Sequence, residues 1–275
     1  MSPVIIIAGK EVRDSIRNRW VVSATLLLAG LAFSLAFLGS APTGGSAAEP
    51  LAVVVVSLAS LTIFLVPLIA LMLAYDALVG EAERGTLLLL LTYPVTKGQV
   101  LLGKFVGHLA VLSLAIVLGY GAAGVAVGMG TENVNAQSWQ AFGALIGSSI
   151  LLGGVFIAIA YLISAIVRER GAAAGIAIGI WLLCVVLYDM GLLGVLVATK
   201  GQIHENLFPW LLIANPTDIF RLFNLTAFDN VRTFSGLAGL SGQVKFSSTF
   251  LVFSLLTWML LPLLGAVIVF RKREL

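Results

Sequence analysis

Long apolar stretches alternate with short polar ones along almost the whole chain. A helix that crosses a bilayer needs about 20 consecutive apolar residues, and several stretches reach that length. The first exceeds the roughly 7–15 residues of a signal-peptide core, so we expect an uncleaved helix there. The pattern predicts an all-α integral membrane protein, a single transmembrane domain of residues 1–275. We expect six membrane spans, with approximate bounds at residues 21–40, 51–78, 101–128, 141–167, 172–197 and 248–270.

The segment before the first span, residues 3–19, has the spacing of an amphipathic helix. With about 100° between successive residues, apolar positions gather on one side and charged positions on the other. Such a helix lies in the membrane interface instead of crossing it. An ordinary basic flank that fixes the topology is a compatible interpretation. The apolar side comprises Ile5, Ala8, Val12 and Ile16, and the opposite side Lys10, Arg13, Asp14 and Arg17.

A polar insert between the second and third spans, residues 80–99, interrupts the apolar pattern. Its leucine run, Leu87–Leu91, is too short to cross a membrane and is flanked by charge on both sides. Exposed to water, it would form an apolar patch, which usually marks an interaction surface. The insert therefore predicts a docking site for a partner protein, with a merely solvated connection as the alternative.

We expect this insert to form one short helix that lies roughly parallel to the membrane. Glu81 and Glu83 favour a helix start through the helix dipole. Pro94 ends the helix, because the residue before a proline is pushed out of the helical region. Thr96 and Gln99 have the spacing of a capping box, which would open the third span.

The composition and the placement of charge agree with this topology. Sixty per cent of the residues are hydrophobic and only 11% are charged, with a mean hydropathy of +1.08, whereas soluble domains have about 25% charged residues. The short loops 41–50 and 129–140 contain no Lys or Arg, while basic residues flank the other span ends. The positive-inside rule then places both termini in the cytoplasm. The long segment 198–247 faces outward, and its aromatic residues predict a membrane-surface or re-entrant element with a helix starting at Pro216.

The spans contain few polar candidates for function. Asp189, next to Tyr188 in the outer part of span 5, is the charged exception. An acidic residue inside a membrane is a functional candidate by default, so these two residues mark a candidate substrate path. The alternative is that Asp189 already lies near the outer interface, where its charge costs little.

Small residues spaced four apart predict close helix packing. Gly171, Gly175 and Gly179 repeat in this way in span 5, so we expect a tightly packed helix, either within the subunit or across a dimer. Pro67 and Pro262 predict kinks or helix breaks in spans 2 and 6.

No pattern in the chain predicts catalysis. There is no Gly-x-x-x-x-Gly-Lys-[Ser/Thr] loop to hold ATP phosphates and no His-Glu-x-x-His or Gly-x-Ser-x-Gly pattern. Cys184 is the single cysteine, which excludes an intrachain disulfide and a multi-cysteine metal site. We therefore expect no enzymatic activity, catalytic residue, metal site or cofactor in the chain itself, and no nucleic-acid partner.

The insert also carries a family resemblance. The order Glu-x-Glu-x-Gly-Thr-Leu, leucine run, Pro, basic residue and Leu-Leu-Gly-Lys resembles the signature of ABC-2 type permeases, and nearly the whole chain follows that family's order of elements. At finer grain, KEVRDSIRNRW, SLASL, PLIALMLAYDALVGE and GTLLLLLTYP are similar to the NosY permeases, the membrane subunits of NosDFY complexes. The matching residues are Glu81, Glu83, Gly85, Thr86, Leu87, Pro94, Lys97, Leu101, Leu102, Gly103 and Lys104.

The resemblance implies that the insert is a coupling helix that fits a groove of a cytoplasmic ATPase, with the loop 168–170 as a second contact. It further implies a NosF-like ATPase that binds ATP and Mg, a NosD-like periplasmic subunit, a second permease copy in a homodimer, and the lipid bilayer of the bacterial inner membrane. The implied role is copper-centre assembly of nitrous-oxide reductase. The expected ATPase-coupling residues are Glu81, Glu83, Arg84, Gly85, Thr86, Arg168, Glu169 and Arg170.

Two other functions compete with a permease subunit. A stand-alone secondary transporter predicts charged residues near mid-bilayer and repeated, broken helices, and the spans carry almost no such charge. A non-transporting membrane anchor would explain the insert but not six glycine-rich spans. The transported species, a sulfur compound, copper or none, stays open at this stage.

Overall fold

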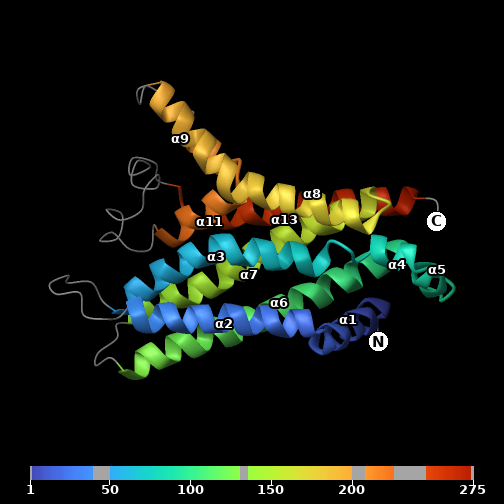
Figure 1. Ribbon diagram of the computed structural model, residues 1–275, viewed down its shortest axis with the longest axis horizontal. Coiled ribbons are helices and arrows are strands. Elements are labelled where there is room, and N and C mark those ends of the chain that lie inside the picture. Colours follow the sequence, from blue (N-terminus) through green and yellow to red (C-terminus); the bar gives the residue numbers. More distant parts are fainter. Residues whose placement is uncertain (1, 40–49, 131–135, 200–207, 226–245, 274–275) are drawn as a thin grey trace.

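The computed structural model describes residues 2–39, 50–130, 136–199, 208–225 and 246–273. The described part is helical and contains no strand, which confirms the all-α prediction. The helix bounds, with the labels of Figure 1, are α1 Pro3–Arg17, α2 Arg19–Gly39, α3 Pro50–Ala74, α4 Val79–Glu83, α5 Thr86–Leu91, α6 Lys97–Gly130, α7 Ala136–Ile166, α8 Arg170–Leu182, the π-helix η1 Leu183–Leu187, α9 Tyr188–Ala198, α10 Phe208–Ile213, α11 Pro216–Leu225 and α13 Ser248–Lys272.

The long helices lie side by side in an elongated bundle (Figure 1). α1, α4, α5 and the C-terminal end of α13 lie together at one end of this bundle, which we name the terminal end. An even number of spans places both termini on the same side of a membrane, so this arrangement agrees with the predicted topology. That the terminal end faces the cytoplasm remains a prediction from the positive-inside rule.

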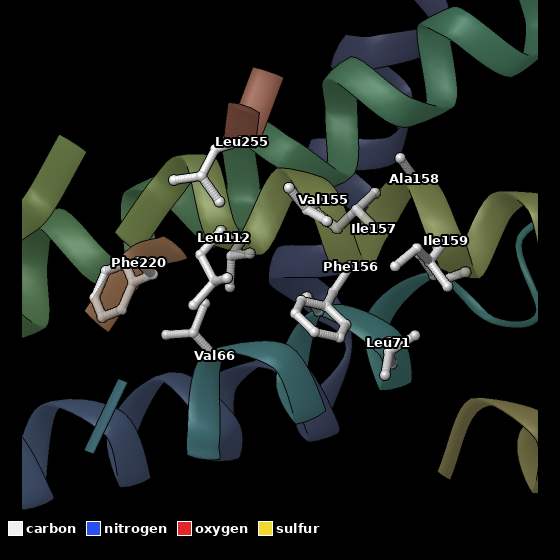
Figure 2. Packing of buried hydrophobic residues seen from close by; sticks show 14 of the residues in the cluster. Val66, Leu71, Leu112, Val155, Phe156, Ile157, Ala158, Ile159, Phe220 and Leu255 are labelled. Carbon is white, nitrogen blue, oxygen red and sulfur yellow. The ribbon is translucent and has the colours of Figure 1, made fainter. Parts of the chain in front are cut away.

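α7 is the central helix of the bundle. Its residues are almost continuously buried from Leu152 to Ala165, as expected for a helix that is apolar on all sides. Figure 2 shows side chains from the neighbouring helices packed around it, including Val66 of α3, Leu112 of α6 and Phe220 of α11. Lipid gives no hydrophobic drive for helices to associate, so this packing holds the bundle together.

The described chain has five or six candidate membrane spans, against the six predicted, at approximately the predicted positions. Five helical stretches of the described chain are long and apolar enough to cross a membrane, and α1 with the following part of α2 would add a sixth. A bend of 73° separates these last two helices, as expected for an interfacial helix followed by a span. Ile5 and Ile16 of α1 are exposed, whereas Ala8 packs inward.

Neither predicted proline breaks its helix, because α3 continues through Pro67 and α13 through Pro262. A kink at either proline remains a prediction. The regular α-helical pattern breaks instead in span 5, at the π-helix Leu183–Leu187. In span 2 the regular helix α3 ends at Ala74 and a turn precedes α4, while the candidate span continues to Glu83.

The glycines of span 5 are not packed within the subunit. A Cβ added at Gly171, Gly175 or Gly179 would meet no described atom within 4 Å, and only 11% of this span is buried in the described chain. The prediction of tight packing inside the subunit is therefore wrong, and packing across a dimer remains a prediction. Close packing occurs at another glycine pair, where a Cβ on Gly103 or Gly107 would lie 2.7 or 2.6 Å from a Cβ atom of α1.

The described part of the external segment packs into the bundle. α11 begins at Pro216, as predicted, and its Ile219 and Phe220 side chains are fully buried. This helix lies against α3, α7 and α13, so it does not rest exposed on a membrane surface. Residues 200–207 and 226–245 of the predicted segment lie outside the described residues.

Candidate functional site

The predicted lateral helix is divided into two short helices, α4 and α5. The hydroxyl oxygen of Ser164, on α7, accepts the backbone N–H groups of Leu78 and Val79 at 3.0 Å each, which satisfies donors that a helix start leaves unpaired. Gly85 then adopts a left-handed conformation with φ of +70°, which glycine tolerates because it has no Cβ. The prediction of a single helix is wrong in this detail, because the glycine turn separates α4 from α5.

α5 lies at the terminal end (Figure 1), and several apolar side chains on and next to it are exposed. Leu87 is fully buried, but Leu88, Leu89 and Tyr93 are 54%, 66% and 68% exposed. We name Leu88, Leu89 and Tyr93 the α5 patch. This patch corresponds to the apolar surface that the leucine run predicts. It is smaller than predicted, because some leucines of the run turn inward.

The start of α6 is fixed by its own cap and by the C-terminal end of α13. The N–H of Thr96 donates to Gln99 Oε1 at 2.9 Å, and the N–H of Gln99 donates to Thr96 Oγ1 at 3.2 Å, which confirms the predicted capping box. Lys97 Nζ donates to the carbonyl of Arg273 at 2.6 Å. Arg273 in turn donates to two carbonyls near the end of α7, at 3.2 Å each.

Glu81 points into the bundle and not toward solvent. Lys104 Nζ on α6 lies 2.7 Å from Glu81 Oε1 and 2.6 Å from Glu11 Oε1 of α1. His108 Nε2, one turn further along α6, lies 3.6 Å from Glu11 Oε2, and His108 Nδ1 lies 2.7 Å from the hydroxyl of Tyr161 on α7. We name Glu11, Glu81, Lys104, His108 and Tyr161 the buried polar cluster. It joins α1, α4, α6 and α7 through side chains that the sequence does not place together.

The buried polar cluster carries ionised groups with little access to water. The side chains of Glu81, Glu11 and Lys104 are only 14%, 10% and 3% exposed. Burial by itself would raise the pKa of Glu11, but the charge and the hydrogen bond of Lys104 outweigh it and hold that pKa below its usual 4.5. Among the described residues, Glu81 Oε2 is buried without a hydrogen-bond partner. A buried ion pair contributes little net stability, because removing the charges from water is costly. Stability alone therefore does not explain why these charged groups are buried together.

Glu83 and Arg170, which both belong to the predicted contact set, meet at the start of α8. The backbone N–H of Arg170 donates to Glu83 Oε1 at 2.7 Å, and the helix dipole favours a carboxylate at this position. The Arg170 guanidinium pairs with Asp76 at 2.9 Å and lies 6.0 Å from the centre of the Tyr75 ring. These contacts fasten the start of α8 to the turn between α3 and α4.

The other predicted contact residues lie at the surface of the terminal end. Arg84, Thr86, Arg168 and Glu169 are exposed, and the Thr86 hydroxyl donates to the carbonyl of Glu81 at 3.2 Å. The structure thus divides the predicted set: Glu81 faces inward, Glu83 and Arg170 hold two elements together, and the remaining side chains are free to meet a partner.

A cleft of about 510 Å³ lies at the terminal end between α1, the α4–α5 pair and the start of α6. Its lining includes the nearly buried side chains of Glu81, Glu11 and Lys104. The exposed side chains of Leu89 and Tyr93 line it as well. The buried polar cluster and the α5 patch therefore share one cleft. Its lining residues are Lys10, Glu11, Asp14, Asp76, Ala77, Glu81, Arg84, Thr86, Leu89, Leu90, Tyr93, Lys104 and His108.

The candidate substrate-path residues fasten the external helices to span 5. The Tyr188 hydroxyl donates to the carbonyl of Leu211 at 2.6 Å, and Arg221 Nη2 lies 2.7 Å from Asp189 Oδ2. Both residues therefore hold α9 against the α10–α11 pair within the chain. Contact with a substrate remains a prediction.

The π-helix η1 supports the same junction. A π-helical turn changes the backbone hydrogen-bond pattern and recurs at functional sites. The carbonyl of Cys184 within η1 accepts hydrogen bonds from Asn215 Nδ2 at 2.8 Å and Thr217 Oγ1 at 3.2 Å. Neither proline nor glycine occurs among Leu183–Leu187, so the sequence offers no signal for this break or for its partners.

We expect the stability of the protein to depend on pH through Asp218, which lies on α11 at the junction with η1 and α9. Burial raises its pKa to about 7, against the opposing charge of Arg221. A carboxyl whose pKa is higher in the folded state stabilises that state most when protonated, below its unfolded pKa, and this stability is lost as the pH rises through the folded pKa. We expect the thermal midpoint in detergent to fall by several degrees between about pH 5 and about pH 8. The variant Asp218→Asn should flatten that profile, and identical profiles for both proteins would contradict the assignment.

In the described chain, no group of three or more His, Cys, Asp or Glu side chains is arranged to hold a metal ion. The terminal end thus combines exposed apolar side chains on and next to α5 with a buried charged interior.

Comparison with known proteins agrees with the resemblance noted in the sequence. Residues 5–275 match the family described as ABC-2 family transporter protein. The chain is 46% identical over 274 residues to the "Probable ABC transporter permease protein NosY" of Stutzerimonas stutzeri, covering 99% of both chains. It is 45% identical over 276 residues to the protein of the same name from Pseudomonas aeruginosa, covering 100% of both. The chain therefore belongs to the ABC-2 family of transporter permeases.

Proposed function

We propose that this ABC-2 permease couples ATP hydrolysis by a separate cytoplasmic ATPase to transport, or to mechanical transmission, across the bacterial inner membrane. The observation that carries the proposal is the α5 patch at the terminal end, in which Leu88 and Leu89 of α5 and Tyr93 just after it are exposed. Apolar side chains gathered at an exposed surface mark an interaction site. The sequence has no P-loop, so the nucleotide site, with ATP and Mg, belongs to the partner.

The attachment of α4 makes the patch suited to transmit force. α4 is capped by Ser164, and its residues are joined to Lys104 on α6 and to Arg170 on α8. A helix seated in the groove of a partner is a recurring recognition mode. A partner that moves α5 therefore acts on three elements of the bundle at once.

The exposed face of span 5 supports a second copy of the permease as a partner. Gly171, Gly175 and Gly179 are open to close approach, and small residues at this spacing let helix backbones meet in a membrane. A homodimer with two-fold symmetry would join identical surfaces. The two-state motion of such a dimer would follow nucleotide-dependent docking at the α5 patch.

We further propose a role in copper-centre assembly of nitrous-oxide reductase, which the sequence resemblance to NosY permeases implies. In that role the ATPase would be NosF-like and a NosD-like subunit would bind on the periplasmic side. The cargo would be a sulfur compound or copper, or the bundle would transmit motion without passing a substrate. A non-transporting anchor and a stand-alone secondary transporter are the alternatives.

Purification of the protein from native membranes tests the proposal. We expect an ATPase to be recovered with the permease in a one-to-one ratio. A permease that is recovered alone and is active by itself in liposomes would contradict the proposal and support a stand-alone transporter. An ATPase that binds but whose hydrolysis has no effect on the permease would support the anchor.

A further inference from the structure

We propose that Lys104 is the positioning residue through which movement of the docked α4–α5 pair reaches α1 and α6. One buried ammonium is shared by a carboxylate from the docking segment and a carboxylate from α1, directly behind the docking cleft. The proposal rests on the ATPase docking proposed above and adds the route by which docking acts on the bundle.

Movement of α5 must pass through α4. α5 is separated from α4 by the turn at Gly85. Ser164 of α7 caps the start of α4, and two side chains of α4, Glu83 and Glu81, attach it to α8 and α6. Glu83 accepts the backbone N–H of Arg170 near the surface. The Arg170 side chain is 48% exposed and pairs with Asp76 in the turn before α4. Glu81 meets Lys104, whose side chain is only 3% exposed. Water and salt screen the first attachment far more than the second, so the Lys104 contact is the stronger attachment.

α1 and α6 receive the movement as one body. A Cβ on Gly103 would lie 2.7 Å from Ile7 Cβ, and a Cβ on Gly107 would lie 2.6 Å from Glu11 Cβ. The two helices therefore pack backbone against backbone along one turn of α6, on both sides of Lys104. The Lys104–Glu11 contact at 2.6 Å lies inside this packed region, so a shift of Lys104 displaces both helices.

The same cluster continues to the central helix. His108 lies one turn beyond Lys104 and is within 2.7 Å of the Tyr161 hydroxyl of α7. Both side chains are buried. α7 packs against α3, α6 and α13, so a rearrangement that reaches Tyr161 reaches the centre of the bundle.

The cluster has the properties of an element with two arrangements. An ammonium has three donors, and Glu81 and Glu11 take two of those of Lys104. Glu81 Oε2 has no hydrogen-bond partner among the described residues, and Glu81 lines a cleft of about 510 Å³. If α4 moves outward, Glu81 gains access to the cleft while Lys104 keeps Glu11. No charge is then left buried and unpaired, which is the costly condition.

The test uses the purified complex of permease and ATPase in nanodiscs. Spin labels at Arg17 of α1 and Ile166 of α7, both exposed, report the distance between these helices, in a background with Cys184→Ser. The first variant, Glu11→Gln/Glu81→Gln/Lys104→Met, removes the charges together. The second, Glu81→Leu, removes only the attachment to α4 and leaves Lys104 paired with Glu11. Lys272→Met, at the exposed end of α13, is the matched control.

We expect both variants to bind the ATPase, to lose the nucleotide-dependent change in label distance, and to lower the permease-dependent ATPase rate by roughly tenfold. Lys104→Arg should keep the change, because a guanidinium can also join two carboxylates, and the control should behave as wild type. Failure of the wild-type permease to bind any ATPase would overturn the docking proposal itself. Normal binding with an unchanged distance response in Glu81→Leu would overturn the role of Lys104 alone.

Discussion

Replacing Gly107 by leucine is expected to separate α1 from α6 and to destabilise the protein. A Cβ at this position would lie 2.6 Å from Glu11 Cβ and 3.0 Å from the carbonyl oxygen of Ala8. Because the second contact is to backbone, a side-chain rotation cannot relieve it. Overpacking of this kind costs about 1–3 kcal/mol or more, which corresponds to a fall of roughly 3–10 °C in the thermal midpoint for a domain of this size.

The thermal midpoint in detergent and the rate of proteolysis at the N-terminal helix measure this effect. Gly121→Leu is the matched control, since it makes the same change on the same helix at a position where an added Cβ meets no described atom within 4 Å. Gly107→Leu should also speed trypsin cleavage after Lys10, because the peptide bond to Glu11 becomes accessible when α1 separates from α6. Equal midpoints and equal proteolysis for the two variants would show that α1 is not packed on α6 as described.

Replacing both exposed leucines of the α5 patch by aspartate is expected to abolish ATPase binding while the permease still folds. Leu88 and Leu89 are more than half exposed, so two charges there leave the core intact. In a docked complex the same side chains would lie in an apolar groove. The loss of two anchoring residues costs at least about 1.4 kcal/mol each, and therefore at least a hundredfold in Kd.

ATPase recovered per permease in a pull-down, together with the elution profile of the permease alone, measures this outcome. Lys272→Asp, an exposed charge change on α13, should bind the ATPase normally. Wild-type recovery with Leu88→Asp/Leu89→Asp would remove the patch from the interface. Loss of recovery in the control as well would indicate a general effect of surface charge instead.

Local patterns in the sequence predict much of the fold. The lengths of the apolar stretches predict the membrane spans, because a helix must be long enough to cross a bilayer of fixed thickness. The capping box of Thr96 and Gln99 and the helix start at Pro216 are local interactions within a few residues. The leucine run predicts the apolar patch because it is flanked by charge on both sides.

The contacts between helices are less predictable, because they depend on which face of each helix meets a neighbour. The GxxxG spacing of Gly103 and Gly107 is the same as that of the span 5 glycines, yet only the former pair is packed within the subunit. Glu81 and Lys104 are 23 residues apart and meet only through tertiary folding. Glu11 is buried one helical turn after Ile7, on a face of α1 that differs from the apolar side predicted from the sequence.

Photo-crosslinking from Leu89 in native membranes tests the central claim most directly. A photoreactive amino acid at this position should give an adduct with the mass of the permease plus one ATPase subunit, because Leu89 is 66% exposed on the α5 patch. The same amino acid at Leu261, which is 65% exposed on α13, should react with lipid and give no such adduct. Absence of the ATPase adduct at Leu89, or equal yield at both positions, would contradict docking through α5.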